Sequence, residues 1–303
     1  MEKFGLSLAS YPSRTEWLEA RRQGIGGSDA PIILGLTNKT PLQLWAEKLG
    51  LAEEMVETPA MWWGKRLEPI VAEHFGLLTE CTLEALGEFT LVRHPSVAPF
   101  QFATLDRVIT GDERGPGVLE VKTAGSFRSG EWEDDCPPAY FAQVQHQISA
   151  TGFAWGAICV LLGGQDFRWM PIERNEEYIA YLIRKEEAFW QCVQDQIEPP
   201  AEAADNKLIN QIHPAPKEAG SLVQLGADAL EWDGRRAHAI EIIKEAEQVK
   251  DAAEASLKQA IGEAEIGSLP DGTSFHWSTQ TRPEHTVKES TFRVLRRKSA
   301  KGA

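Results

Sequence analysis

The chain has 303 residues, of which 42% are hydrophobic and 25% are charged, a balance that predicts a globular protein with one domain of about 200 residues plus an appendage. Its formal net charge of −14 argues against a passive nucleic-acid coat, which needs a basic surface, but is compatible with an enzyme that has a local basic channel. The sequence has no apolar run of about 18 residues and no signal-peptide pattern, so we expect a cytoplasmic protein rather than a membrane or secreted protein. Its four cysteines have no C-x-x-C spacing, so we expect free thiols rather than a zinc site.

The first part of the chain combines helical and strand patterns. Apolar spacing and capping residues predict helices over residues 13–22, 29–34, 41–50, 60–76, 138–151 and 175–196. Alternating and β-branched runs predict strands over residues 87–93, 101–109, 117–123, 154–162 and 166–172. A glycine-rich turn at 111–117 joins the second and third of these strands as a hairpin. The order α-β-β-β-α-β-β-α predicts an α/β (α+β) domain over residues 1–200, with helices packed on a sheet.

The rest of the chain follows a different pattern. Residues 201–226 are rich in Pro, Ala and Gly, which predicts a linker. Residues 227–262 carry apolar side chains at steps of three, four and seven, which predicts a helix that either packs on the domain or forms an antiparallel arm or coiled-coil element. A small hairpin follows, and the segment 227–303 ends in a basic tail that either contacts phosphates or is a solvated end. The basic residues of this tail are Arg293, Arg296, Arg297, Lys298 and Lys301.

The strand predicted at 117–123 carries two charged residues, Glu120 and Lys122, among apolar ones. Alternate residues of a strand point to the same face, so Glu120 and Lys122 share a face with Val118. Together with Asp106 upstream they form the pattern D-x(13)-E-x-K. Two carboxylates can hold Mg²⁺, and a nearby lysine can steady a water molecule or a phosphate oxygen. A surface strand with one ordinary salt bridge is the alternative, because E-x-K tripeptides are common.

Two predicted helices add polar residues that could face the same place. Glu68 precedes Pro69 inside its helix, where a proline costs roughly 3 kcal/mol unless the helix bends, and such a bend could aim Glu68 into a site. An ordinary exposed glutamate is the alternative. Tyr140, Gln143 and Gln147 are spaced by three and four residues and therefore share one helix face. A face of amides and a phenol suits contact with phosphate or metal-bound water, or else it is a solvated face.

A glycine-rich turn near the N-terminus has the composition of an anion site. Arg21, Arg22 and Ser28 flank Gly24–Gly27. Glycines let backbone N–H groups approach an anion, and an arginine can clamp it through two hydrogen bonds. The segment therefore predicts a phosphate pocket, but not a Walker loop, because no G-K-[ST] follows.

Five motifs, in this order, resemble those of the YqaJ-type viral recombinase nucleases, which are relatives of phage lambda exonuclease in the PD-(D/E)xK superfamily. The motifs are RRQGIGGSDA (residues 21–30), WGKRLEP (63–69), LD (105–106), LEVKT (119–123) and YFAQVQ (140–145). The resemblance covers about residues 12–196, and the segment beyond residue 200 is similar to the C-terminal extension of some phage members. One departure is that the Pro-Asp pair of the superfamily is replaced here by Leu105-Asp106.

The resemblance implies a PD-(D/E)xK core, with a mixed central sheet flanked by helices, and a C-terminal helical and hairpin extension. It implies a Mg²⁺-dependent 5′→3′ exonuclease, with Mn²⁺ as a substitute, which digests linear double-stranded DNA and leaves 3′ single-stranded overhangs for phage-type recombination by strand annealing. The resemblance implies that Asp106, Glu120 and the Val121 carbonyl bind a metal, and that Glu68 serves a second metal or its waters. It implies that Lys122 orients the attacking water and helps to deprotonate it, and that Gln143 supports the active-site edge. It also implies that Tyr140, Ser28 and either Arg21 or Arg22 contact the DNA and its 5′-phosphate.

The resemblance also implies partners: duplex DNA with 5′-phosphorylated ends, a single-strand annealing protein, and further copies of the chain in a ring, with a trimer favoured. Two other functions stay open, an inactive DNA-binding recombination scaffold and a site-specific endonuclease of the same superfamily. Retention of Asp106, Glu120 and Lys122 disfavours the scaffold. An end-phosphate pocket disfavours the endonuclease, because an internal cutter needs no anchor for a 5′ end.

Overall fold

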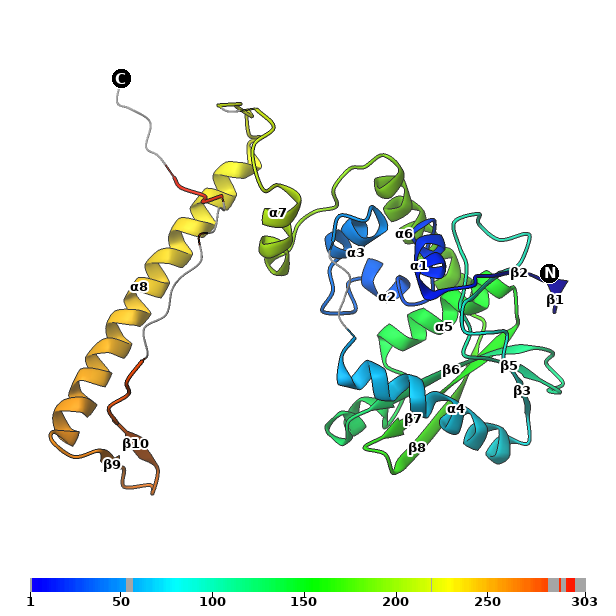
Figure 1. The fold of residues 1–303 in the computed structure, drawn as a ribbon, viewed down its shortest axis with the longest axis horizontal. Helices are drawn as coiled ribbons and strands as arrows, with labels where there is room; N and C mark the ends of the chain where they lie inside the picture. The colour runs from blue at the N-terminus through cyan, green and yellow to red at the C-terminus, as the bar shows by residue number, and fades with distance from the viewer. Residues whose placement is uncertain (1, 53–56, 219, 283–288, 290–292, 298–303) are drawn as a thin grey trace. The chain divides into compact units, whose positions relative to one another are not determined.

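The structure, a computed structural model, describes residues 2–52, 57–218, 220–282, 289 and 293–297 (Figure 1). Contacts divide the chain into two units, Met1–His213 and Pro214–Ala303. All candidate site residues lie in the first unit. Among the described residues, no helix is long and apolar enough to cross a membrane.

A mixed sheet of five strands forms the centre of the first unit. Its spatial order is β3 (Thr82–Glu84), β5 (Arg107–Thr110), β6 (Gly117–Ala124), β7 (Trp155–Leu162) and β8 (Asp166–Glu173). β6 and β7 run parallel, whereas the other neighbours are antiparallel. The predicted hairpin is therefore confirmed as the β5–β6 pair, and the mixed sheet confirms the predicted fold class.

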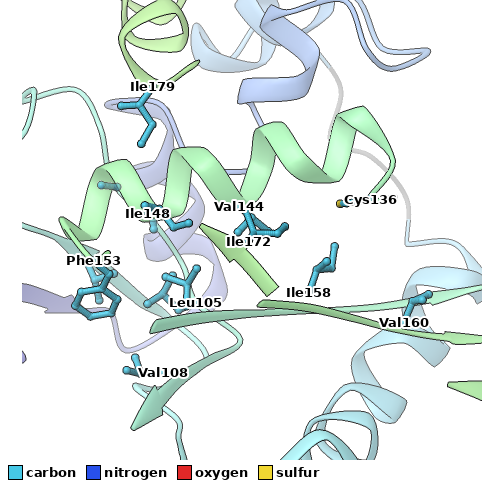
Figure 2. Packing of buried hydrophobic residues seen from close by; sticks show 14 of the residues in the cluster. Leu105, Val108, Cys136, Val144, Ile148, Phe153, Ile158, Val160, Ile172 and Ile179 are labelled. Carbon is cyan, nitrogen blue, oxygen red and sulfur yellow. The ribbon is translucent and has the colours of Figure 1, made fainter. Parts of the chain in front are cut away.

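Helices cover both faces of this sheet (Figure 1). The helices of the first unit are α1 (Arg14–Arg22), α2 (Ala30–Ile33), α3 (Pro41–Lys48), α4 (Pro59–Thr79), α5 (Pro138–Thr151), α6 (Glu176–Gln194) and α7 (Asn206–Ile212), with short 3-10 helices at Ser126–Trp132 and Ala203–Asp205. α5 lies in the crossover that parallel strands require. Its Val144 packs in one apolar cluster with Ile158 of β7 (Figure 2), and Val118 of β6 belongs to the same cluster. On the opposite face, Phe75 of α4 clusters with Leu119 of β6, so β6 alternates between the two faces as predicted.

The N-terminal helices pack with α6 and α7 around a second core. Ile25, Trp45, Phe189 and Leu208 are buried together there. Because Leu208 lies on α7, the first part of the segment predicted as a linker is helical and packs on the first unit. This core fixes the glycine-rich turn, since Ile25 lies within it.

The strand predicted at 101–109 is wrong at its start. Residues 101–106 form only isolated bridges, from Gln101 to Ile25 and from Ala103 to Val92, and β5 begins at Arg107. One bridge joins this segment to the glycine-rich turn and the other joins it to Val92, so the segment does not belong to the five-stranded sheet. Asp106 therefore precedes its strand rather than ending it.

Two further boundaries differ from the sequence-based expectation. The strand predicted at 87–93 becomes β4 (Thr90–Arg93) in a separate small sheet with β1 (Glu2–Lys3) and β2 (Leu6–Ser10), which the sequence did not predict. Gly76 does not end its helix, because α4 runs on to Thr79. A Cβ at Gly76 would lie 3.2 Å from the Cys81 carbonyl oxygen, so this glycine permits a close approach of the chain.

The described residues of the second unit include a long helix and a hairpin. α8 (Asp228–Ile261) has 34 residues, none of which is buried. β9 (Ile266–Ser268) pairs antiparallel with β10 (Ser274–His276). In the basic tail, Arg297 forms an ion pair with Asp233 of α8, whereas Lys298 and Lys301 lie outside the described residues.

Candidate active site

The sheet has an open edge where β6 continues beyond its partner β5. Pairing with β5 stops at Leu119, opposite Arg107, whereas β6 continues along β7 to Ala124. Asp106 stands at this opening, and its Oδ2 accepts a hydrogen bond of 2.8 Å from the Val121 N–H. Since the N–H and C=O of one strand residue point to the same neighbouring strand, the Val121 carbonyl faces the same opening.

Glu120 lies next to this opening and is held by three donors. Its side chain is buried and accepts hydrogen bonds from Lys122 Nζ at 2.5 Å, Gln143 Nε2 at 2.6 Å and Gln147 Nε2 at 2.6 Å. Lys122 Nζ also donates to Gln143 Oε1 at 3.1 Å and lies 5.1 Å from the Tyr140 ring centre. The charged face predicted for β6 and the amide face predicted for α5 therefore meet each other.

Glu68 approaches from α4, which is continuous through Pro69. Its Oε1 accepts a hydrogen bond of 2.9 Å from Arg107 Nη1, and Arg107 also donates to the Asp106 carbonyl oxygen. The sequence reasoning did not single out Arg107. Its position directly after Asp106 is the feature of the sequence that could have indicated a role in the site.

The carboxylates leave this site with excess negative charge. Burial, followed by the charges of Glu120 and Glu68, raises the pKa of Asp106 well above its usual value. Burial lowers the pKa of Lys122, but the Glu120 carboxylate outweighs it and the net shift is upward. A site with these properties favours the binding of a cation.

The donor set fits a hard divalent cation. Asp106, Glu120 and the Val121 carbonyl supply oxygen atoms only, and Asp106 Oδ1 accepts no hydrogen bond from the described residues. Among those residues, no three His, Cys, Asp or Glu side chains converge closely enough to hold a metal by themselves. Mg²⁺ is usually bound by one or two carboxylates together with waters and substrate phosphates, which is compatible with this arrangement.

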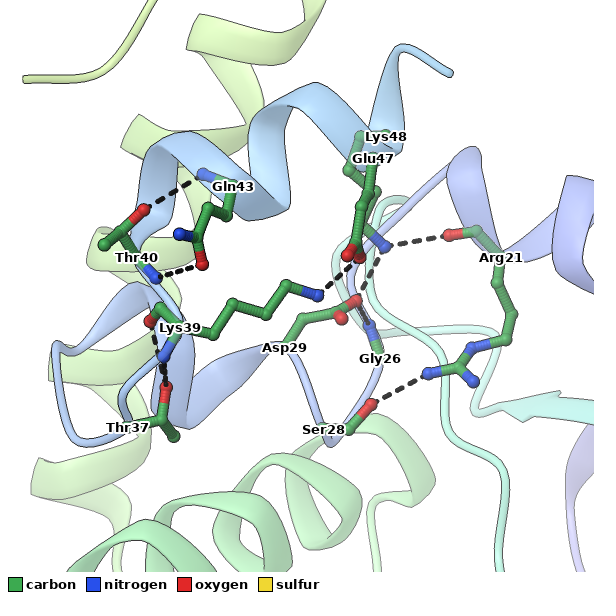
Figure 3. A network of polar contacts seen from close by, with 10 residues as sticks. All are labelled: Arg21, Gly26, Ser28, Asp29, Thr37, Lys39, Thr40, Gln43, Glu47 and Lys48. Atoms are coloured by element: carbon green, nitrogen blue, oxygen red, sulfur yellow. Dashed lines mark hydrogen bonds and ion pairs between the residues drawn. The ribbon is translucent and has the colours of Figure 1, made fainter. Parts of the chain in front are cut away.

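A basic cavity of about 420 Å³ lies beside the glycine-rich turn. Its charged lining residues are Arg14, Arg21, Arg22, Lys39, Lys48, Asp29 and Glu47. Arg21 Nη2 donates to Ser28 Oγ at 2.8 Å (Figure 3), whereas Arg22 pairs with Glu19 at 2.8 Å. The turn needs glycine at position 24, where a Cβ would lie 2.4 Å from the Phe100 carbonyl oxygen.

A buried ion pair holds the turn in place. Lys48 Nζ donates to Asp29 Oδ2 at 2.6 Å and to the Arg21 carbonyl at 2.9 Å, and the same Asp29 oxygen accepts from the Gly26 N–H at 2.9 Å (Figure 3). Burial raises the pKa of Asp29, but the charges of Lys48 and Arg21 outweigh it and lower the net value. The sequence reasoning missed this pair, although Asp29 lies only two residues after Gly27.

The turn also touches the carboxylate site. A Cβ at Gly27 would lie 3.1 Å from Gln147 Cγ and 3.4 Å from Gln143 Cγ. The N–H groups of Gly27 and Ser28 donate to no acceptor among the described residues. The basic cavity and the Asp106–Glu120 site are therefore neighbours.

A buried network supports α5 behind its amide face. His146 Nδ1 lies 2.6 Å from Glu186 Oε1, and Nε2 lies 2.9 Å from the Phe102 carbonyl, which can only accept. Gln101 Nε2 donates to Glu186 Oε2 at 2.7 Å. Burial lowers the pKa of His146, but Glu186 and the Phe102 carbonyl outweigh it and raise the net value above 6.5.

This network predicts a pH-dependent stability. Because the folded-state pKa of His146 exceeds the unfolded value near 6.5, its stabilisation is full below about pH 6.5 and is lost as the pH rises through the folded pKa. At pH 6, His146→Gln should lower the thermal midpoint by roughly 10 °C. The difference in thermal midpoint between this variant and wild type should shrink at higher pH. Thermal unfolding measured from pH 5.5 to 10 tests this. His238→Gln, an exposed control on α8, should match wild type throughout, and a pH-independent difference for His146→Gln would contradict the assignment.

Comparison with known proteins shows a similarity over part of the chain. Residues 16–154 match the family model described as the YqaJ-like viral recombinase domain. This part of the chain is therefore similar to the domain of that family. The chain is 39% identical over 190 residues to the uncharacterized protein YqaJ of Bacillus subtilis (strain 168), a match that covers 61% of this chain and 58% of that protein. The chain thus spans less than two thirds of the length of this relative.

Solved structures similar to the chain include an alkaline exonuclease (LHK-Exo) from Laribacter hongkongensis, with a TM-score of 0.47, 21% identity, and coverage of 61% of this chain and 94% of that one. A phage-related exonuclease from Haemophilus somnus 129PT has a TM-score of 0.46, 14% identity, and coverage of 57% and 95%. Within residues 16–154, Asp106 directly precedes β5 and Glu120 and Lys122 lie on β6, so these three residues lie on or next to one hairpin.

Proposed function

We propose that the chain is a metal-dependent exonuclease that digests linear double-stranded DNA in the 5′→3′ direction and leaves 3′ overhangs for strand annealing. The observation that carries this proposal is the convergence of Asp106, Glu120 and Lys122 at the open edge of β6. The adjacent basic cavity and the similarity to the YqaJ-like viral recombinase domain support it. The test is digestion of 5′-phosphorylated linear duplex with Mg²⁺, with and without a chelator.

In the proposed mechanism, Asp106, Glu120 and the Val121 carbonyl would hold Mg²⁺, with Mn²⁺ as a substitute. The bound ion would supply Lewis-acid stabilisation of the charge that develops on the scissile phosphate. Lys122 would orient the attacking water and, as an ammonium, stabilise the hydroxide that forms when this water passes its proton to solvent. Gln143 would fix the Lys122 ammonium, because its Oε1 accepts from Nζ at 3.1 Å while its Nε2 holds Glu120. Tyr140, whose ring lies beside Lys122, would line the DNA path.

The basic cavity would hold the 5′-phosphate of the DNA end. Arg21 is better placed than Arg22, because Arg21 contacts the Ser28 hydroxyl whereas Arg22 pairs with Glu19. Arg14 lines the same cavity and forms no ion pair with the described residues. The Gly27 and Ser28 N–H groups would complete the set of donors.

Removal of the 5′-phosphate should slow digestion by wild type about 10- to 100-fold, the usual worth of a hydrogen bond to a charged group. It should barely slow Arg21→Ala further, because the two changes delete one interaction. Initial rates on phosphorylated and dephosphorylated duplex, for both proteins, measure this coupling. Arg22→Ala is the matched control and should keep the wild-type preference. Additive losses for Arg21→Ala would place this residue elsewhere on the DNA path.

Assembly into a ring, with a trimer favoured, would reconcile the net charge of −14 with a polyanionic substrate. Basic residues would face a central channel and the excess acids would face solvent. Light scattering should then give the mass of a small ring, with a trimer favoured. Digestion of DNA that is already bound should continue after excess competitor DNA is added as a trap. A monomer at micromolar concentration that releases after each cut would overturn this part alone. The proposed protein partner is a single-strand annealing protein that loads onto the 3′ overhang.

The endonuclease alternative differs in its substrate. An exonuclease should degrade linear duplex and leave a covalently closed circular plasmid intact, whereas an endonuclease should nick the circle. A scaffold without activity should bind both and cut neither. The two substrates assayed side by side separate all three functions.

A further inference from the structure

Arg107 occupies the side of the site from which Glu68 approaches. It lies opposite Leu119 in the β5–β6 pair, and directly opposed residues project to the same face of a sheet, which here is the α4 face. Its Nη1 bridges Glu68 Oε1, at 2.9 Å, and the Asp106 carbonyl oxygen. The side chains of Arg107 and Glu68 are 18% and 30% exposed, so this ion pair is partly withdrawn from solvent.

This contact changes which carboxylates are available to a metal. A guanidinium stays protonated at all relevant pH values, so Arg107 is a permanent cation beside Glu68. Glu68 already has its counter-charge, whereas Asp106 has an oxygen without a donor among the described residues. The absence of any three converging acidic or metal-binding side chains among those residues agrees with this division.

We infer that Arg107 is a positioning residue that neutralises Glu68 and keeps it out of the metal ligands, so that the DNA-free chain binds one divalent cation between Asp106 and Glu120. This inference rests on the proposed function, because it takes the Asp106–Glu120 site as the metal site. It differs from the role for Glu68 that the sequence resemblance implied, service of a second metal. Arg107 supplies the positive charge that pairs with Glu68.

The test is a Mn²⁺ titration of the full chain without DNA, in which free Mn²⁺ is followed by electron paramagnetic resonance. Wild type should bind one Mn²⁺ per chain. Arg107→Gln should release Glu68 and admit a second Mn²⁺, and Arg107→Lys, which keeps the charge, should bind one. The double variant Arg107→Gln/Glu68→Gln should also return to one.

Two single variants complete the design. Glu68→Gln should keep the wild-type stoichiometry and change the Mn²⁺ affinity by less than the roughly 10-fold loss expected for an essential metal-site residue. Arg114→Gln removes an arginine that also pairs with carboxylates, Asp112 and Glu173, and should behave as wild type. Glu68→Gln keeps the test decisive even if Arg107→Gln fails to fold.

Two Mn²⁺ per wild-type chain, an unchanged stoichiometry in folded Arg107→Gln, or loss of Mn²⁺ from Glu68→Gln would overturn the inference and leave the proposed nuclease standing. Failure of the proposed function looks different. Wild type would then bind no Mn²⁺, or Asp106→Ala would bind it as well as wild type.

Discussion

Asp106→Ala and Glu120→Ala should each abolish phosphodiester hydrolysis while DNA binding largely survives. Each change removes an oxygen ligand from the proposed metal site, and a metal's stabilisation of transition-state charge is worth several kcal/mol. The expected loss is therefore about 10³-fold or more in the single-turnover rate. Cleavage of end-labelled duplex in Mg²⁺ measures the rate, and binding of the same duplex in Ca²⁺ measures the affinity.

Asp112→Ala provides the matched control, because Asp112 lies in the β5–β6 turn and pairs with Arg114 rather than with the site. It should cut at the wild-type rate. Ca²⁺ should support binding but little cutting, since its looser coordination positions water poorly. Near-native turnover by either Asp106→Ala or Glu120→Ala would show that the metal site is assigned to the wrong residues.

Lys122→Ala should lower the rate of the chemical step by about 10²- to 10⁴-fold, the usual range for a positioned proton-transfer group. Lys122 Nζ contacts both Glu120 and Gln143, so its removal takes away the group that would place the water but leaves two amide donors on Glu120. Single-turnover rates at saturating enzyme measure the chemical step, and Mn²⁺ titration should show little loss of metal.

Lys258→Ala removes another lysine that pairs with a glutamate, Glu254 on α8, and should leave the rate unchanged. The thermal midpoint of Lys122→Ala should be measured beside its rate, because Glu120 is buried and loses the ammonium that pairs with it. An effect confined to substrate affinity, with a normal rate at saturation, would make Lys122 a phosphate contact instead.

Much of the site could be predicted because it follows short-range periodicity. The period of two placed Glu120 and Lys122 on one face of a strand, and the spacing of three and four placed Gln143 and Gln147 on one face of a helix. The meeting of these two faces follows from packing α5 on β6. The start of β5 could not be predicted in this way, because residues 101–106 have a strand-like pattern but their bridge partners lie outside the central sheet.

The remaining residues depend on contacts between distant segments. Arg107 meets Glu68 across 39 positions in the chain, and Lys48 meets Asp29 across 19. A single charged residue carries no periodic signal that would indicate its partner. The small sheet could not be predicted for the same reason, because β2 and β4, which pair in it, are short and far apart in the sequence.

The contact of Gly27 with Gln143 and Gln147 has a consequence for the size of the product. The same two amides hold Glu120, so the anchor proposed for the DNA end and the proposed point of cleavage are built on one rigid frame. The frame would act as a molecular ruler, measuring the same short length of strand from the end at every cut.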